Sequence, residues 1–163
     1  MDVIIRHSEL SDVPAIKAIY QQESCYGGTL QLPYPSVDKW QKRFEQADNN
    51  FYSLIAEVDG EIVGQIGLDH FSNPRRRHVA NLGMAVSEYH QGKGIGKKLL
   101  NAMLELANNW LAVTRIELEV YIDNPAAIKL YQSRGFEIEG TAKGYAFRHG
   151  KYVDCHLMAK VSS

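Results

Sequence analysis

"YHQGKGIGKKLL", residues 89–100, places three glycines at alternate positions directly before an apolar helical pattern. Alternating glycines are unfavourable in a helix or a strand, because each glycine loses more backbone entropy on folding than other residues do and has no side chain to pack. Bare backbone N–H groups followed by a helix N-terminus form an anion site, most often one for phosphate. The stretch therefore predicts a phosphate-binding turn between a strand and a helix.

The spacing of the glycines excludes two common nucleotide loops. A Walker A loop requires Gly, four residues, Gly-Lys and Ser or Thr; counting from Gly96 puts Gln91 and Lys98 at its two ends. The dinucleotide pattern G-x-G-x-x-G, begun at the first glycine, meets Lys97 where glycine is required. What remains is Gln-x-x-Gly-x-Gly over residues 91–96. From this loop alone, a plain strand-to-helix turn stays the alternative interpretation.

The flanking segments predict a strand–helix–strand crossover around the glycines. A β-type run, "HVANLGMAV", precedes them at residues 78–86, and a second, "RIELEVYI", follows at 115–122. Between the loop and the second strand, helical spacing places one set of apolar residues on one face of a long helix. These residues are Ile95, Leu99, Leu100, Met103, Leu104, Ala107 and Trp110.

The remainder of the chain predicts one mixed α/β domain over residues 1–163 with a single central sheet. A strand at residues 3–6 precedes two helices, and two hairpins and a short helix complete the order β, α, α, three strands, α, β, α, two strands. We expect N-caps at Ser11, Ser36 and Asn124, and hairpin turns at Asp59-Gly60 and His149-Gly150. The first two helices should bury Val13, Ile16 and Ile19, and Val37, Trp40 and Phe44.

Composition excludes several classes of protein. The formal net charge is −1, which gives no overall attraction to nucleic acid or to an anionic membrane. The opening "MDVIIRHSELSD" does not have the form of a secretory signal, and no apolar run reaches the roughly 18 residues of a membrane span. Cys25 and Cys155 stand alone, so we expect reduced thiols and a cytoplasmic protein.

A second segment, "VYIDNPAAIKLYQSRGFEIEG" at residues 120–140, gives the loop its context. It has a strand, an asparagine, a short helix carrying Leu-Tyr, and Gly-Phe opening another strand. With the Gln-x-x-Gly-x-Gly loop, it resembles the GNAT superfamily of acyl-CoA-dependent N-acetyltransferases, whose loop reads Arg/Gln-x-x-Gly-x-Gly/Ala. Segments 27–36, 73–80 and 137–161 are further similar to the bacterial YhhY-type subgroup, small acetyltransferases thought to act on free amino acids or similar amines.

The resemblance implies a GNAT fold: a mostly antiparallel central sheet, helices on both faces, and a splay between the strand "GMAV" and its neighbour. It also implies direct transfer of acetyl from acetyl-CoA to a primary amine, without a metal. Tyr131 would be the general acid that protonates the departing thiolate. The implied contacts to the donor come from the splayed strand, the glycine loop and the short helix. They are Met84, Ala85, Val86, Gln91, Gly92, Lys93, Gly94, Ile95, Gly96, Lys97, Asn124, Ala127 and Tyr131.

The general base is not identified by the resemblance. Histone-type members carry a glutamate on the strand before the loop, and their spacing falls on Ala80 here. Candidates near strand ends are Asp69, His70, Glu117 and Glu119, each with the alternative of a solvent-facing strand residue, or a water relay. A lysine amine has a pKa of about 10.4 and an α-amine one of about 8. An α-amine is therefore more often deprotonated at neutral pH than a lysine amine, and it needs less help from a base. The absence of the glutamate thus favours an acceptor that has an α-amine.

The acceptor site is encoded more weakly than the donor site. Tyr34, Trp40 and Tyr145 are the candidate walls, with Phe147 and Tyr152 beside them, although all five also fit ordinary packing and turns. We expect an N-acetyltransferase of a small-molecule amine, an amino acid above all. Acetylation of protein N-termini or lysines is the alternative, and a CoA-binding module without catalysis is the second. We expect no nucleic-acid or membrane partner. We do expect a homodimer, because paired GNAT subunits are common.

Overall fold

The computed structural model describes residues 1–162, in which seven strands form one sheet in the order β1-β2-β3-β4-β5-β7-β6. Every neighbouring pair is antiparallel except β4 with β5, which run parallel on either side of the α4 crossover. The strands are β1 (Val3–His7), β2 (Phe51–Val58), β3 (Glu61–His70), β4 (Val79–Val86), β5 (Arg115–Tyr121), β6 (Glu137–Arg148) and β7 (Lys151–Val161). The helices are α1 (Val13–Tyr20), α2 (Glu23–Gly27), α3 (Val37–Glu45), α4 (Ile95–Trp110) and α5 (Pro125–Ser133).

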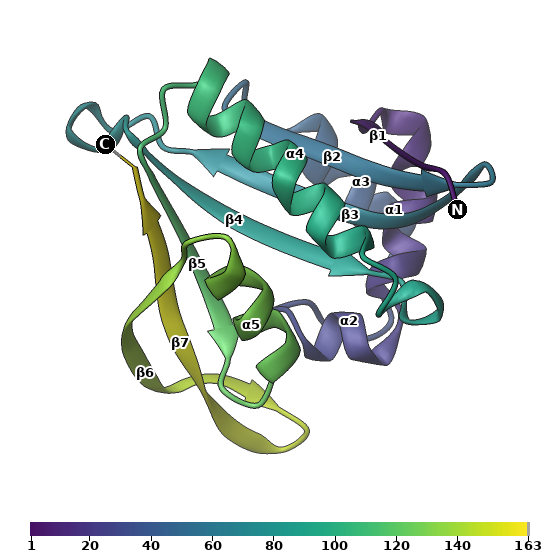
Figure 1. Ribbon diagram of the computed structural model, residues 1–163. Helices are drawn as coiled ribbons and strands as arrows, with labels where there is room; N and C mark the ends of the chain where they lie inside the picture. Colours follow the sequence, from purple (N-terminus) through teal and green to yellow (C-terminus); the bar gives the residue numbers. More distant parts are fainter. Residues whose placement is uncertain (163) are drawn as a thin grey trace.

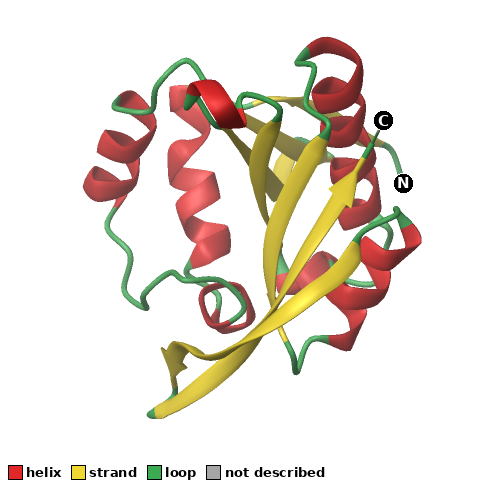
Figure 2. Ribbon diagram, turned by 90° about the vertical axis from the view of Figure 1, so that its left-hand side faces the viewer, coloured by secondary structure: helices red, strands yellow, loops and turns green. Residues whose placement is uncertain are grey.

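Helices cover both faces of this sheet (Figure 1, Figure 2). One face packs against α4 and α5, whose apolar residues share a buried cluster with β2 to β5. The other face packs against α1 and α3 through a second cluster, which includes Ile16, Trp40 and Ile55. The mixed α/β fold predicted from the sequence is confirmed.

The parallel pair β4–β5 separates after three residues. Val79, Ala80 and Asn81 pair with residues 115–117 of β5, and the ladder ends there. Beyond that point β4 stays paired with β3 as far as Val86, whereas β5 stays paired with β7 as far as Tyr121. The two strands therefore diverge into a V, and the expected splay is confirmed.

Several local predictions are confirmed by the backbone. The hairpin turns at Asp59-Gly60 and His149-Gly150 have positive φ at both residues, as a type I′ turn requires. Ser36 caps α3 by accepting a hydrogen bond from the N–H of Lys39 at 3.3 Å. Asn124 caps α5 through the N–H of Ala127 at 3.2 Å.

The expected cap at Ser11 is wrong. A 3₁₀ turn over Leu10–Asp12 precedes α1, and the Asp12 carboxylate accepts a hydrogen bond from the N–H of Glu9 at 2.8 Å. Arg6 binds the same carboxylate through both of its terminal nitrogens, at 2.8 and 2.9 Å. The Asp12 carboxylate is therefore held by Arg6, an interaction that the uncharged hydroxyl of Ser11 cannot make.

Two residues of the apolar helical patterns lie outside the core, and one helix was not predicted. Val37 is 39% exposed and Trp110 is 74% exposed; they are the first residue of α3 and the last residue of α4. The unpredicted helix, α2, has only five residues and contains a glycine, so no apolar period marks it. Cys25 and Cys155 are both buried and free. No helix within residues 1–162 has the length and apolar character needed to cross a membrane.

Asp12→Asn should lower the free energy of unfolding by about 1 to 2 kcal/mol at pH 7, since it removes a paired carboxylate from a partly exposed arginine. Hydrogen bonds from Arg6 lower the pKa of Asp12 in the folded state. A lowered pKa gives stability that is present above the unfolded value of about 3.9 and is lost as pH falls.

Urea unfolding from pH 7 to pH 3 measures this effect. The difference in the free energy of unfolding between Asp12→Asn and the unmodified protein should be constant down to about pH 5 and shrink below about pH 4. Asp38→Asn is the matched control, because Asp38 pairs only with Lys42 on the exposed face of α3. A difference that persists unchanged at pH 3 would contradict the assigned role of the carboxylate.

Candidate active site

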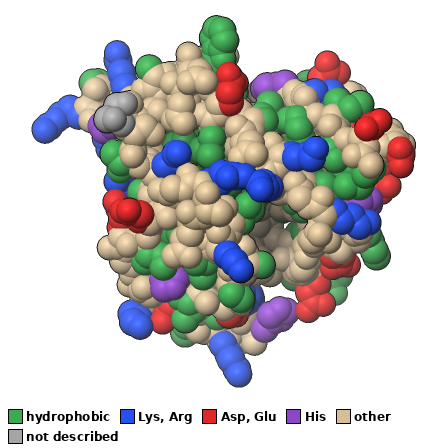
Figure 3. Space-filling view, viewed as in Figure 1, with side chains coloured by type: hydrophobic (Ala, Val, Ile, Leu, Met, Phe, Trp, Pro, Cys, Tyr) green, Lys and Arg blue, Asp and Glu red, His purple; other side chains and the backbone are tan. Residues whose placement is uncertain are grey.

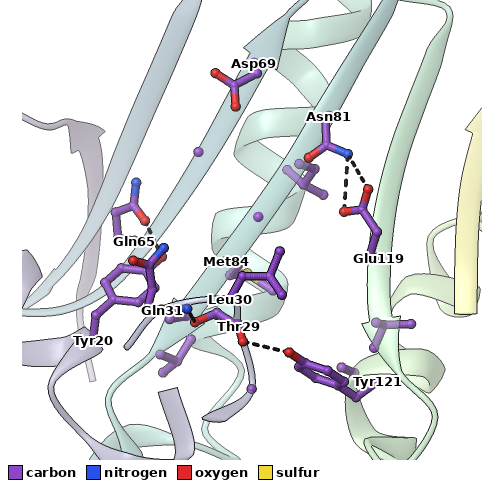
Figure 4. A pocket seen from close by; sticks show the side chains of 18 of the residues that line it. Tyr20, Thr29, Leu30, Gln31, Gln65, Asp69, Asn81, Met84, Glu119 and Tyr121 are labelled. Carbon is purple, nitrogen blue, oxygen red and sulfur yellow. Dashed lines mark hydrogen bonds between the residues drawn. The ribbon is translucent and has the colours of Figure 1, made fainter. Parts of the chain in front are cut away.

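A cavity of about 510 Å³ lies where β4 and β5 separate. Residues of β3, β4 and β5 form its floor and sides, and α1, α3, α5 and the segment 28–31 close around it (Figure 4). The side chains of Asn81 and Glu119 meet at the narrow end of the V, where the strand pairing stops. The cavity therefore occupies the space that β4 and β5 leave open.

Residues from both faces of the sheet line the cavity. Met84 and Val86 of β4 pack toward the α4–α5 face, whereas Ala85 between them belongs to the cluster under α1 and α3. All three line the cavity, together with Tyr131 of α5 and Tyr20 of α1. The face that carries α4 and α5 is visibly hollowed, with Lys and Arg side chains near the hollow (Figure 3). Ligand groups on the two faces of the sheet could thus meet within the split.

Backbone hydrogen-bond donors of β4 face the split. In an antiparallel pair, the residues whose N–H and C=O groups point to the partner alternate with residues whose groups point away. The N–H of Ser87 bonds the carbonyl of Val63 opposite it, so by alternation those of Met84 and Val86 point away from β3. The carbonyl of Val86 agrees with this, because it accepts from Cys25 and Gln91 rather than from β3.

The glycine loop has the backbone of an anion cradle. Gly92 and Gly94 have φ of 76° and 80°, a left-handed conformation that only glycine adopts without strain. Gly94 is the N-cap of α4, so the N–H groups of the first helical turn behind it have no partner within the helix. Gln91 fixes the loop to β4 by donating to the Val86 carbonyl at 3.1 Å. The loop therefore fits a pyrophosphate.

The space between the loop and the cavity is kept open by Gly96. A Cβ built there would lie 3.6–3.7 Å from Leu130 of α5 and from Met84 and Val86 of β4, in the gap between those two elements. On the far side of this gap, Asn124 uses its side-chain oxygen as the cap of α5, which leaves its two N–H donors for a ligand. Ala127 lines the cavity beside it. A narrow chain with amide groups fits this route.

Tyr131 is buried at the α5 wall of the cavity. Its ring packs edge-on against Phe136, with the ring centres 5.6 Å apart. Burial raises the pKa of Tyr131 to about 12. The phenol therefore keeps its proton at neutral pH and can act as a proton donor.

A pair of glycines forms the floor on the α1–α3 side. Gly67 of β3 and Gly83 of β4 stand directly opposite each other in the ladder. Gly67 has a packing reason, because a Cβ there would lie 3.1 Å from the Phe51 ring. Gly83 has none, since a Cβ there meets nothing within 4 Å. A glycine inside a strand without a packing reason indicates the close approach of a ligand.

Two of the four candidate bases line the cavity and two do not. Glu117 is held by Arg115 and Arg76 at 2.9 and 2.8 Å, and despite partial burial these partners lower the pKa of Glu117. The His70 ring lies against the carbonyl of Arg77 at 2.6 Å. These two side chains are therefore engaged elsewhere.

Asp69 and Glu119 are the two acids that do line the cavity. Burial, with the charge of Asp48, raises the pKa of Asp69 at the outer end. Glu119 lies at the apex of the V, where both of its oxygens accept from the Asn81 amide at 3.2 and 3.4 Å. Glu119 is thus the acid that is oriented at the split.

Comparison with known proteins identifies the family. The model of the acetyltransferase (GNAT) family matches residues 16–136. This chain belongs to the GNAT family. The L-amino acid N-acetyltransferase AaaT of Escherichia coli (strain K12) is 44% identical over 160 residues, which cover 98% of each chain. The spermidine N(1)-acetyltransferase of Vibrio cholerae is 25% identical over 159 residues, or 94% of this chain and 90% of that one.

Solved GNAT structures share the fold over nearly the whole chain. A ribosomal-protein-alanine N-acetyltransferase from Brucella melitensis has a TM-score of 0.88 at 28% identity, covering 97% of this chain and 99% of its own. A phosphinothricin acetyltransferase from Sinorhizobium meliloti, solved with AcCoA, has a TM-score of 0.88 at 24% identity, covering 100% and 90%. Family membership confirms the expected GNAT fold, the N-acetyltransferase class and acetyl-CoA as the donor. Within residues 1–162, no three His, Cys, Asp or Glu side chains are grouped to hold a metal ion.

The expected acceptor walls of this GNAT enzyme are only partly brought together. Trp40 lines the cavity and stacks on Tyr20 with ring centres 4.9 Å apart. Tyr34 does not line it; the residue is 96% exposed and lines a separate pocket that also includes Lys17. Phe147 and Tyr152 pack edge to face, with ring centres 5.0 Å apart, and lie outside the cavity.

Tyr145 reaches the cavity because of a β-bulge. Three residues, Lys143 to Tyr145, stand opposite the single residue Asp154 in the β6–β7 ladder, with Gly144 at a φ of 58°. The Asp154 carboxylate holds this bulge by accepting from the N–H of Gly144 at 2.8 Å. Partial burial, with the charge of Glu119, raises the pKa of Tyr145. The bulge therefore turns Tyr145 toward the acidic apex, as bulges beside active sites do.

Several lining residues were not predicted from the sequence. The Tyr20 hydroxyl donates to Gln65 at 2.7 Å, and Gln65 in turn donates to Ser53 at 3.0 Å. Residues 28–31 close one side of the cavity, held there by the Tyr121 hydroxyl, which donates to the carbonyl of Thr29 at 2.9 Å (Figure 4). Their contacts join segments far apart in the chain, so no local pattern indicates them.

Gly94→Ala should weaken CoA binding by at least about ten-fold, because a side chain strains the left-handed residue at the centre of the cradle. Titration calorimetry with CoA measures the change. Gly140→Ala is the matched control, since Gly140 in β6 has open space around it and no positive φ. Equal affinities in Gly94→Ala and the unmodified enzyme would exclude the loop as the pyrophosphate site.

Proposed function

We propose that this enzyme acetylates the α-amine of a free L-amino acid. The carrying observation is the cavity that crosses the sheet at the β4–β5 split, with donor-binding groups on the α4–α5 side and an oriented carboxylate on the other. Similarity to an L-amino acid N-acetyltransferase over 98% of both chains supports the amino-acid acceptor. A cavity of about 510 Å³ is also the size of a small-molecule site.

The donor is held mainly by backbone groups. N–H groups of residues 92–97 would bind the pyrophosphate, and Lys93 and Lys97 stand on the exposed side of that loop. The N–H groups of Met84 and Val86, with the Asn124 amide, would bind the pantetheine chain along the open edge of β4. When bound there, acetyl-CoA supplies an acetyl thioester within the split. The Met84 N–H, which points into the split, would serve as an oxyanion donor to the thioester carbonyl.

Two side chains on opposite walls of the cavity would move the protons. The Glu119 carboxylate, held by Asn81, takes a proton from the ammonium group of the acceptor, directly or through one water. The Tyr131 hydroxyl gives its proton to the departing sulfur on the α5 side. Glu119 is assigned as the base because an amide donor orients its carboxylate. Tyr131 is assigned as the acid because its buried phenol remains neutral.

A thiol-release assay with acetyl-CoA tests this function directly. The acceptor panel should include free L-amino acids, polyamines, and peptides with a free N-terminus or a lysine. Turnover of free amino acids with higher kcat/KM than the matching peptides is the expected result. Turnover of peptides alone, or CoA binding without turnover of any amine, would overturn the proposal. The homodimer and the cytoplasmic location expected from the sequence stay predictions.

Glu119→Gln and Tyr131→Phe should each lower kcat by roughly 10² or more, with different pH dependence. The Glu119→Gln deficit should shrink between pH 7 and pH 9.5, because more of the amine is already deprotonated in solution. The Tyr131→Phe deficit should stay constant over the same range, since a phenol with a pKa of about 12 remains protonated throughout.

Steady-state kinetics across that pH range separate the two roles, and each variant serves as the control for the other. CoA affinity should be unchanged in Glu119→Gln, whose side chain is on the acceptor side. The opposite pattern, a constant deficit in Glu119→Gln and a shrinking one in Tyr131→Phe, would exchange the assignments. Full activity in either variant would remove that residue from the mechanism.

A further inference from the structure

Arg43 is the single Lys, Arg or His among the described residues that line the cavity. It shares that space with two acids, Asp69 and Glu119. A cavity built to bind amines alone would gain nothing from a guanidinium, because like charges repel. The presence of Arg43 therefore indicates that the acceptor also carries a negative group.

The guanidinium of Arg43 is oriented by two contacts. Its carbon lies 4.4 Å from the centre of the Trp40 ring, so the planar group stacks on the indole. Its Nη1 donates to the side-chain oxygen of Gln31 at 3.1 Å. Trp40 is itself buried and stacked on Tyr20. Arg43 thus rests on a rigid platform on the acceptor side of the sheet.

The same guanidinium has no acidic partner within residues 1–162. By contrast, Arg6, Arg115 and Arg148 each pair with a carboxylate. A guanidinium has five N–H donors, and the bond to Gln31 uses one of them. Donors of Arg43 therefore remain for a ligand, and a carboxylate matches their planar geometry.

We propose that Arg43, positioned by Trp40 and Gln31, binds the α-carboxylate of the acceptor and makes the enzyme select free amino acids over peptides. This inference rests on the function proposed above. A free amino acid carries its amine and its carboxylate on one carbon, so Glu119 and Arg43 bind its two charged ends. A polyamine has no carboxylate, and a peptide N-terminus has a neutral amide at that position.

Gln31, the second contact of Arg43, comes from a different segment of the cavity wall. It belongs to the segment 28–31, which the Tyr121 hydroxyl anchors to β5 through the carbonyl of Thr29 (Figure 4). Arg43 comes from α3, which forms another part of that wall. The Arg43–Gln31 bond therefore joins two segments that line the cavity, where an entering carboxylate would meet the free donors of the guanidinium.

The test compares L-leucine with L-leucinamide at saturating acetyl-CoA, in the unmodified enzyme and in Arg43→Gln. The variant should raise the KM for leucine about ten-fold or more and change the KM for leucinamide less than about two-fold. Because each acceptor is compared with itself, the different amine pKa values of leucine and leucinamide cancel. Arg43→Lys, which keeps the charge and loses the paired N–H geometry, should give an intermediate KM for leucine.

Lys42→Gln is the matched control, since Lys42 is an exposed cation on the same helix that pairs with Asp38. It should leave both KM values and the CoA affinity unchanged. A KM raised by the same factor for leucine and leucinamide, or for neither, would overturn the role of Arg43 while leaving the proposed function in place. Turnover of neither acceptor by the unmodified enzyme would instead count against the proposed function, and the inference would fall with it.

Discussion

The short ladder between β4 and β5 is the constraint on which the rest of this enzyme depends. Pairing stops at Asn81 opposite Glu117, although both strands continue for several residues. If it continued to Val86, strand hydrogen bonds would occupy the donors of β4 and side chains would fill the space. The split instead gives a through-sheet cavity and an open strand edge at the same place. Donor binding and acceptor access therefore have one structural cause.

Separating two strands inside a sheet leaves backbone groups without partners, which is costly where they are buried. The enzyme limits this cost at the wide end of the V. There the Val86 carbonyl accepts from Gln91 and from the Cys25 thiol. At the narrow end, the Asn81 and Glu119 side chains join the two strands by a hydrogen bond, which satisfies no backbone group. Between these ends the Met84 N–H points into the split, so binding of the donor there would complete the sheet.

The features on which the proposed donor side rests could be predicted from the sequence because they are local. Gly92 and Gly94 need positive φ within one loop, and Asn124 and Tyr131 lie on one short helix. Spacing along the chain therefore carries the information. The same holds for the caps and hairpin turns, whereas Ser11 failed because the partner of Asp12, Arg6, lies on the preceding strand.

The acceptor side depends on contacts between distant segments, which spacing does not record. Arg43 and Gln31 lie on either side of the chain turn that contains Tyr34, and a hydrogen bond joins them. Tyr34 itself is exposed to solvent. Asp69 and Glu119 lie in the cavity, whereas the neighbouring acid Glu117 does not, because Glu117 has two arginine partners. Strand alternation places Arg115 on the same face as Glu117, but no sequence pattern indicates Arg76. Tyr145 was predicted as a wall from its type, but the bulge that aims it was not.

This difference in construction has a consequence for specificity. The donor site is made largely from N–H groups, which survive most side-chain substitutions as long as the glycines remain. The acceptor site is made from a few side chains, so changes at those positions alter the bound amine without disturbing the fold. GNAT relatives that share this backbone are accordingly named for a ribosomal-protein alanine, for spermidine and for L-amino acids. In the acceptor site proposed for this chain, the carboxylate at the apex and the guanidinium of Arg43 would be complementary to a zwitterion, and they would discriminate against each acceptor that lacks one of its two charges.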